Sequence, residues 1–228
     1  LLSAAALALA VVAPLAHAHT EGDIILRAGA ITVNPKADSS SVKVDQGPLA
    51  GADLGGKATM SSDTQLGLNF AYMITDHVGI ELLAATPFEH DVKLKGTALS
   101  AANGKLGSLK HLPPTLSVVY YPLDSKSVFQ PYVGAGINYT WIYDEHVGSR
   151  ASAEGFDNFK AKISWGMAWQ LGADYMLTDN IMINAQARYI DIDTRATVEN
   201  NAVAPGTRAK VNVDVDPWVY MVALGYKF

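Results

Sequence analysis

The chain ends in PWVYMVALGYKF, residues Pro217 to Phe228, and this stretch carries the strongest structural signal in the sequence. Read with a period of two, one face is wholly apolar and aromatic at both ends: Trp218, Tyr220, Val222, Leu224, Tyr226 and Phe228. The opposite face is small or charged and includes Ala223, Gly225 and Lys227. A strand of a soluble sheet normally turns its large residues inward and its polar residues outward. The pattern therefore favours a strand whose bulky face meets lipid and whose small face lines a crowded barrel interior.

The composition fits a membrane barrel better than a soluble domain. Charged residues make up 17% of the 228 residues, whereas soluble domains usually contain about 25%. After the first segment, no stretch reaches the roughly 18 to 20 continuous apolar residues that a spanning helix needs. The net charge of -5 argues against a nucleic-acid partner, and the absence of cysteine fits an envelope protein that needs no disulfide.

Residues 1–18 have the features of a signal peptide. LLSAAALALAVVAPLA is an apolar core, and Ala16-His17-Ala18 matches an A-x-A cleavage site. The usual basic segment is missing, so we expect the sequence to be truncated at its N-terminus. We predict a signal peptide over 1–18 and a barrel over 19–228; a short buried helix is the alternative reading of the first segment.

Seven further stretches alternate as the last one does. They are residues 24–33, 64–75, 78–84, a strand ending at 120, 133–141, 163–177 and 181–188. Four long polar connections, 34–63, 89–108, 143–161 and 193–216, alternate with short ones, as in outer-membrane barrels. We predict an all-β fold: a monomeric, transmembrane, eight-stranded antiparallel up-and-down β-barrel with long extracellular loops and short periplasmic turns. The alternative, a soluble ligand-binding barrel, would have a polar outside.

Aromatic residues fall at both ends of the predicted strands. Those next to the long connections are Trp141, Trp165, Tyr189 and Trp218, and those next to the short turns are Tyr72, Tyr121, Tyr175 and Phe228. Such belts are expected at the two membrane interfaces. The outward faces carry no charge in their central band, where Lys or Arg would cost about 2–4 kcal/mol.

The inward positions predict a polar layer. An eight-stranded barrel is barely wide enough for its own side chains, and its inward residues include Arg27, Glu81, Asp174, Arg188 and Lys227. Mixed charges in such a lumen are expected to pair, because unpaired ones are costly. Two readings follow: a structural plug of ion pairs, or a polar site for a zwitterion such as a small amino acid.

Three prolines mark one seam of the barrel. Pro87 lies nine residues above Val78 in the third strand, and Pro113, next to Pro114, lies eight residues below Tyr121 in the fourth. These strands are antiparallel neighbours, so the prolines meet at similar height. Proline cannot donate to a strand ladder, so pairing should stop there. Unpaired backbone is costly in hydrocarbon, which places such a gap near the outer rim. We hypothesise a lateral opening; the alternative is that both strands simply end at the membrane surface.

Signals for catalysis or metal binding are weak. The histidines are scattered, and His146 with Ser149 has no evident third partner for nucleophilic catalysis. The Asp-x-Asp pairs at 191–193 and 214–216 could bind Ca²⁺, but such pairs are usually solvated. We expect no enzyme activity, no cofactor and no metal.

Four segments resemble the outer-membrane protein W (OmpW) family: Ala223–Phe228, Gln130–Tyr139 (QPYVGAGINY), Gly22–Gly29 (GDIILRAG) and Leu112–Thr115 (LPPT). The resemblance covers the whole chain after residue 18. It implies a narrow barrel associated with the passage of small hydrophobic molecules, which leave through a side exit into the membrane. The terminal Phe228 also resembles the signature by which outer-membrane barrels are recognised for assembly.

We therefore predict a channel in the outer membrane of a Gram-negative bacterium for passive uptake of small, mainly hydrophobic molecules, with lateral exit between the third and fourth strands. Expected partners are outer-membrane lipid and lipopolysaccharide, the assembly machinery and apolar solutes. The alternative is an envelope anchor, adhesin or receptor that acts through its loops and does not transport.

Overall fold

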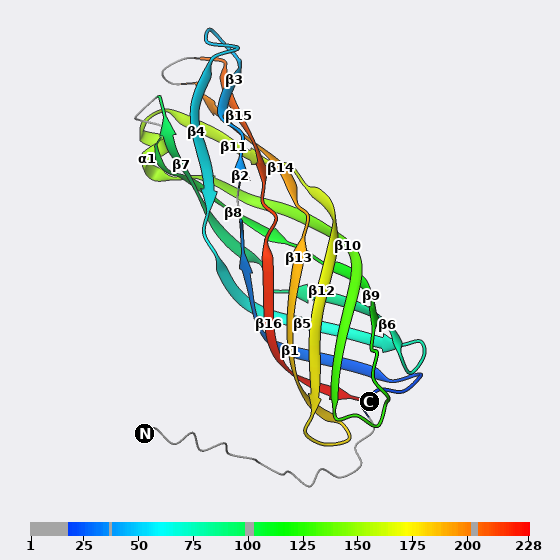
Figure 1. Ribbon diagram of the computed structural model, residues 1–228. Coiled ribbons are helices and arrows are strands. Elements are labelled where there is room, and N and C mark those ends of the chain that lie inside the picture. The colour runs from blue at the N-terminus through cyan, green and yellow to red at the C-terminus, as the bar shows by residue number, and fades with distance from the viewer. Residues whose placement is uncertain (1–17, 37, 99–102, 202–204) are drawn as a thin grey trace, which may run out of the picture.

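The protein is a slender closed barrel that continues at one end into a second, curved sheet (Figure 1). The computed structural model describes residues 18–36, 38–98, 103–201 and 205–228. The expected signal peptide therefore lies outside the described residues, except for Ala18. The described residues contain one short helix, α1 (Ser149–Ala153), and no helix among them is long and apolar enough to cross a membrane.

Eight strands form the barrel wall. They are β1 (Ile24–Asn34), β5 (Asp63–Met73), β6 (Val78–Ala85), β9 (Thr115–Tyr120), β10 (Phe129–Val147), β12 (Ser164–Met176), β13 (Ile181–Ile190) and β16 (Trp218–Lys227). Each pairs antiparallel with its two neighbours, and β16 closes the cylinder by pairing with both β1 and β13. Three short connections, 74–77, 121–128 and 177–180, lie at the end that carries the C-terminus (Figure 1).

The alternation of the last strand holds in the fold. Along β16, Val222 and Leu224 are 62% and 65% exposed on the outer wall, whereas Val219, Met221 and Ala223 are buried inside. The other wall strands show the same alternation of exposed and buried residues, with exposed Leu, Ile, Val and aromatic side chains on the outside. The predicted eight-stranded membrane barrel is thus confirmed, because this outer surface fits only an apolar solvent.

The long connections between the wall strands are themselves folded into strands, which the sequence analysis did not predict. They form β2 (Asp38–Ser39), β3 (Val42–Gln46), β4 (Asp53–Met60), β7 (Phe88–Thr97), β8 (Gly104–Leu112), β11 (Phe156–Ala161), β14 (Asp193–Asn200) and β15 (Thr207–Asp214). With the upper part of β10 they make the second sheet, which we call the extracellular extension (Figure 1). Its strands bury Val92 and Leu94 and expose Lys93. Their outer face is polar because it meets water, and this polarity resembles that of a loop.

The predicted aromatic belts are placed outward with one exception. Trp141, Trp165 and Trp218 are exposed next to the extension, and Tyr72, Tyr175 and Phe228 are exposed at the turn end. Tyr189 is half-buried against Trp218, with 5.6 Å between ring centroids. The placement of Tyr121 in a belt is wrong, because its side chain is fully buried in the lumen. Tyr120 takes the outward position, and strict alternation turns the next residue inward.

Candidate functional site

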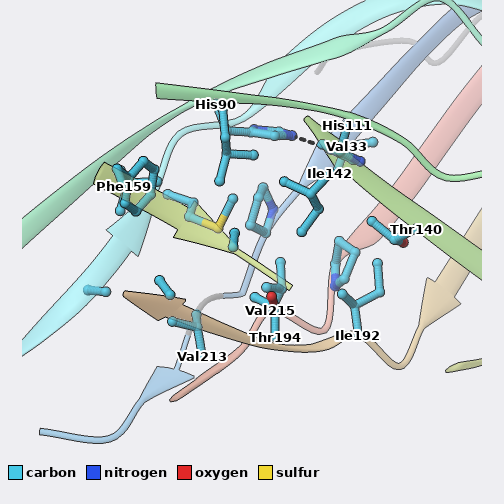
Figure 2. A pocket seen from close by; sticks show the side chains of 18 residues that line it. Val33, His90, His111, Thr140, Ile142, Phe159, Ile192, Thr194, Val213 and Val215 are labelled. Carbon is cyan, nitrogen blue, oxygen red and sulfur yellow. Dashed lines mark hydrogen bonds between the residues drawn. The ribbon is translucent and has the colours of Figure 1, made fainter. Parts of the chain in front are cut away.

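An apolar pocket lies inside the extracellular extension and is lined in part by the ends of the barrel strands, such as Val33 of β1 (Figure 2). None of its lining residues carries a formal charge. Val33, Ile142, Phe159, Ile192 and Val213 come to it from five different strands or their ends. Such a cavity excludes water from its walls and can take up an apolar solute.

Two histidines form the polar feature of this pocket (Figure 2). His90 Nδ1 lies 2.6 Å from the Ser61 carbonyl, and His90 Nε2 lies 2.7 Å from His111 Nε2. The Phe88 ring stacks on His111 with 5.4 Å between centroids. Burial lowers the pKa of His90. The pKa of His111 is lowered to about 3, first by burial and then by the neighbouring His90. Both imidazoles are therefore neutral at ordinary pH.

Below the pocket, four charged side chains close the lumen. Arg27 Nε lies 3.0 Å from Asp174 Oδ1, and Arg27 Nη1 lies 3.4 Å from Glu81 Oε2. Arg188 Nη2 lies 2.6 Å from the other oxygen of Glu81. All four residues are at most 1% exposed. Two cations and two anions thus neutralise each other in a lumen that has no room for bulk water.

Neutral polar groups complete this layer. Arg27 also donates to Asn69 Oδ1 and to the Tyr121 hydroxyl, at 2.8 and 2.9 Å. His19 Nε2 lies 2.9 Å from Asp174 Oδ2. Of the five predicted lumen residues, Lys227 lies apart from the four-residue cluster: its Nζ is 3.6 Å from Asp23, nearer the turn end. The inward Tyr121 and His19 are members that sequence analysis missed.

The three predicted prolines flank a break between β6 and β9. The ladder pairs Leu83 with Thr115, and above it Phe88 pairs with His111. Between these two pairs, none of residues 84–87 pairs with any of residues 112–114. A hollow of about 530 Å³, open space included, lies at this break, lined by Ala84, Ala85, Leu112, Pro113, Pro114, Tyr139 and Trp141. Pro87 is exposed, and it is not one of the residues that line this hollow.

The backbone on both sides of the break makes hydrogen bonds away from it. On the β6 side, Thr86 N donates to Leu66 O at 2.9 Å. On the β9 side, Tyr139 N donates to Pro114 O at 3.0 Å, and Asn138 Nδ2 donates to Pro113 O at 3.1 Å. These groups are thus satisfied without bonds across the break, as a membrane requires. The exposed Trp141 in the lining places the break at the outer aromatic belt.

Comparison with known proteins identifies the family. The model of the OmpW family matches residues 20–228. The chain belongs to the OmpW family. It is 43% identical to outer membrane protein W of Vibrio cholerae over 224 residues, which is 96% of this chain and 97% of that protein. Outer membrane protein W of Escherichia coli K12 is 40% identical over 215 residues, covering 93% and 92%.

A solved structure agrees with this assignment. The crystal structure of OprG from Pseudomonas aeruginosa is 48% identical, covers 93% of this chain and 99% of its own, and superposes with a TM-score of 0.86. This OmpW-family chain is accordingly an outer-membrane barrel of a Gram-negative bacterium, and its exposed apolar wall sits in the lipid bilayer.

The histidine pair of this OmpW-family barrel escaped the sequence analysis. His90 and His111 are 21 residues apart in a stretch interpreted as a loop. The alternation of Val92 and Leu94 with lysines was the signal that could have placed His90 on an inward face.

The two Asp-x-Asp pairs do come together. Asp193 lies opposite Asp214, and one oxygen from each of Asp191, Asp193 and Asp216 lies within 4.8 Å of the others. Exposed carboxylates of this kind are commonly solvated, and we assign no ion to them.

Proposed function

We propose that this OmpW-family barrel passes small, mainly apolar solutes inward by diffusion and releases them sideways into the outer membrane between β6 and β9. The uncharged pocket supports the first half of this route, since it offers a dry surface to an apolar solute. The charged layer supports the second half. An apolar molecule gains nothing by displacing buried ion pairs, so the way straight down is unfavourable.

The break in the ladder is the observation that carries the proposal. Along β8, His111 lines the pocket while its neighbour Leu112 lines the outer hollow. Along β10, Thr140 lines the pocket while its neighbour Trp141 lines the outer hollow. One thickness of wall therefore separates the inner cavity from the membrane side, at the height where β6 and β9 do not pair. The expectation drawn from the family resemblance, a side exit for small hydrophobic molecules, points to the same route.

One observation favours a second candidate, a site for small zwitterions such as small amino acids. Arg188 Nη1 is buried, and among the described residues it has no hydrogen-bond partner. A carboxylate could accept from it. This proposal also keeps four expectations from the sequence: cleavage of the segment 1–18, a monomeric state, contact with lipopolysaccharide, and assembly through the C-terminal strand.

Cross-linking across the break tests the route, because the chain has no cysteine of its own. The double variant Ala84→Cys/Pro114→Cys is treated with a short, reducible bis-thiol cross-linker in Gram-negative cells that lack their own homologue. The control, Leu82→Cys/Leu116→Cys, links positions that already pair and are exposed on the outer wall. Uptake of a naphthylamine dye is followed by fluorescence. We expect the cross-link at the break to abolish most of the uptake, reduction to restore it, and the control to behave as wild type.

Other outcomes separate the alternatives. Equal uptake with and without the cross-link at the break rejects the lateral exit. Uptake no faster than in cells without the protein rejects the channel and leaves the anchor, adhesin or receptor. Replacing Pro87, Pro113 and Pro114 together by alanine gives an independent check, since unchanged uptake by that variant would also reject the opening.

A further inference from the structure

The two pocket histidines form a hydrogen-bond chain with a defined direction. The Ser61 carbonyl can only accept, so His90 Nδ1 carries the proton of that contact. Neutral His90 then has a lone pair on Nε2, and His111 Nε2–H donates to it. Neutral His111 has no second proton, so its Nδ1 keeps a lone pair. Among the described residues, none donates a hydrogen bond to this nitrogen.

This lone pair is the unmet polar group of an otherwise apolar cavity. His111 is 6% exposed, so water has little access to it. The Thr140 hydroxyl donates to Asn138 Oδ1 and the Thr194 hydroxyl donates to Lys162 O, each at 2.7 Å. A buried acceptor without a donor is costly. Protonation does not relieve it, because burial keeps the pKa of His111 at about 3.

We propose that the pocket selects apolar solutes that carry one hydrogen-bond donor, such as a phenol or an aliphatic alcohol, with His111 Nδ1 as the acceptor. The inference rests on the proposed uptake function and names the solute class for it. Cationic and anionic solutes are disfavoured, because none of the lining residues carries a compensating charge. A pure hydrocarbon fits the walls but leaves the acceptor unsatisfied.

The position of His111 connects this selection to the route. His111 pairs with Phe88 directly above the break, and the two rings stack. A hydroxyl bound at His111 therefore holds the solute body at the height of the break. The acceptor thus both recognises the solute and retains it beside the proposed exit.

The matched solutes 4-ethylphenol and ethylbenzene test the inference, since they differ by one hydroxyl. Full-length protein with ¹⁵N-labelled histidine is placed in lipid nanodiscs, and the imidazole ¹⁵N resonances are recorded during titration with each solute. We expect 4-ethylphenol to shift the His111 Nδ1 signal and ethylbenzene to leave it in place. His77 serves as internal control, because its ring contacts the Tyr121 carbonyl at the turn end, outside the pocket.

Uptake gives the second readout. His111→Phe keeps a ring against Phe88 and removes the acceptor. One hydrogen bond is worth about fivefold in affinity, so the uptake ratio of 4-ethylphenol to ethylbenzene should fall about fivefold in this variant. An unmoved Nδ1 signal, or an equal ratio in folded variant and wild type, overturns the inference while the proposed function stands. If neither solute is taken up, the proposed function fails, and the wild-type titration still decides whether the pocket binds a donor.

Discussion

Removing the guanidinium of Arg27 should destabilise the barrel more than any other single truncation in the lumen. Arg27 contacts both oxygens of Asp174, one oxygen of Glu81, the Asn69 amide oxygen and the Tyr121 hydroxyl. In Arg27→Met, His19 and Asn184 are the donors that Asp174 keeps among the described residues, and the layer gains a net negative charge. Breaking a buried ion pair from one side costs about 3–5 kcal/mol. We expect a loss of that size in the free energy of unfolding.

Urea unfolding in lipid vesicles, followed by tryptophan fluorescence, measures this loss. The neutral double variant Arg27→Met/Asp174→Leu should recover most of it, because both charges leave together. Lys105→Met is the surface control: it breaks the 2.6 Å ion pair with Asp91, in which both side chains are exposed, and should cost no more than about 1 kcal/mol. Two results would refute the argument that mutual neutralisation holds the layer together. One is a free energy of unfolding for Arg27→Met within about 1 kcal/mol of wild type, and the other is a double variant as unstable as the single one.

Three further outcomes follow from other parts of the structure. Val222→Arg places a charge on the lipid-facing middle of β16 and should cost about 2–4 kcal/mol in the same unfolding assay, whereas Ser152→Arg on the exposed extension should stay within about 0.5 kcal/mol. Gly29→Ala would drive a Cβ into the backbone carbonyl of Val222, so the band of folded, heat-modifiable protein should be lost on gels. The control Gly148→Ala should fold, because its Cβ meets only ordinary contacts. Equal yields of folded protein from the two variants would contradict the close packing of β1 on β16. Burial and the facing Asp214 raise the pKa of Asp193, so the folded extension binds its proton more tightly than the unfolded chain does, and stability should fall as pH rises through the window between the ordinary Asp value and the raised one. Asp193→Asn should remove this dependence and stabilise the protein at pH 7 by about 0.2–1 kcal/mol, and an unchanged pH profile in that variant would count against the cross-strand repulsion.

Alternation in the sequence predicted the barrel because each wall strand turns one face to the lipid and the other to the packed lumen. Residues 218–228 show bulky and small side chains in strict turn, and the structure puts Leu224 on the wall and Ala223 in the lumen. The same rule, applied consistently, would have placed Tyr121 inside, next to the outward Tyr120. Composition failed in the extracellular extension, because strands whose outer face meets water contain as many lysines and aspartates as a loop does.

The prolines were informative because their effect is local. A proline removes one backbone donor from a ladder, and Pro87, Pro113 and Pro114 stand on both sides of the break between β6 and β9. Pro131, which stands alone within β10, still pairs with Ala173. The concentration of three prolines at one seam is therefore what indicated the break. The sequence did not indicate how the neighbouring backbone is satisfied. The bonds from Asn138 and Tyr139 to the proline carbonyls depend on β10 lying alongside, which is a tertiary arrangement.

The sequence by itself determined the class of the protein, the number of wall strands, the lipid-facing side of each one and the place of the break. Each of these follows from the period of one strand or from one residue type. Only the tertiary structure decided which charges meet in the lumen, that Lys227 stays apart from Arg27 and Asp174, and that His90 and His111 form a pair inside an apolar pocket. Such contacts depend on barrel closure and on the register between strands distant in the chain, and no local pattern encodes that register.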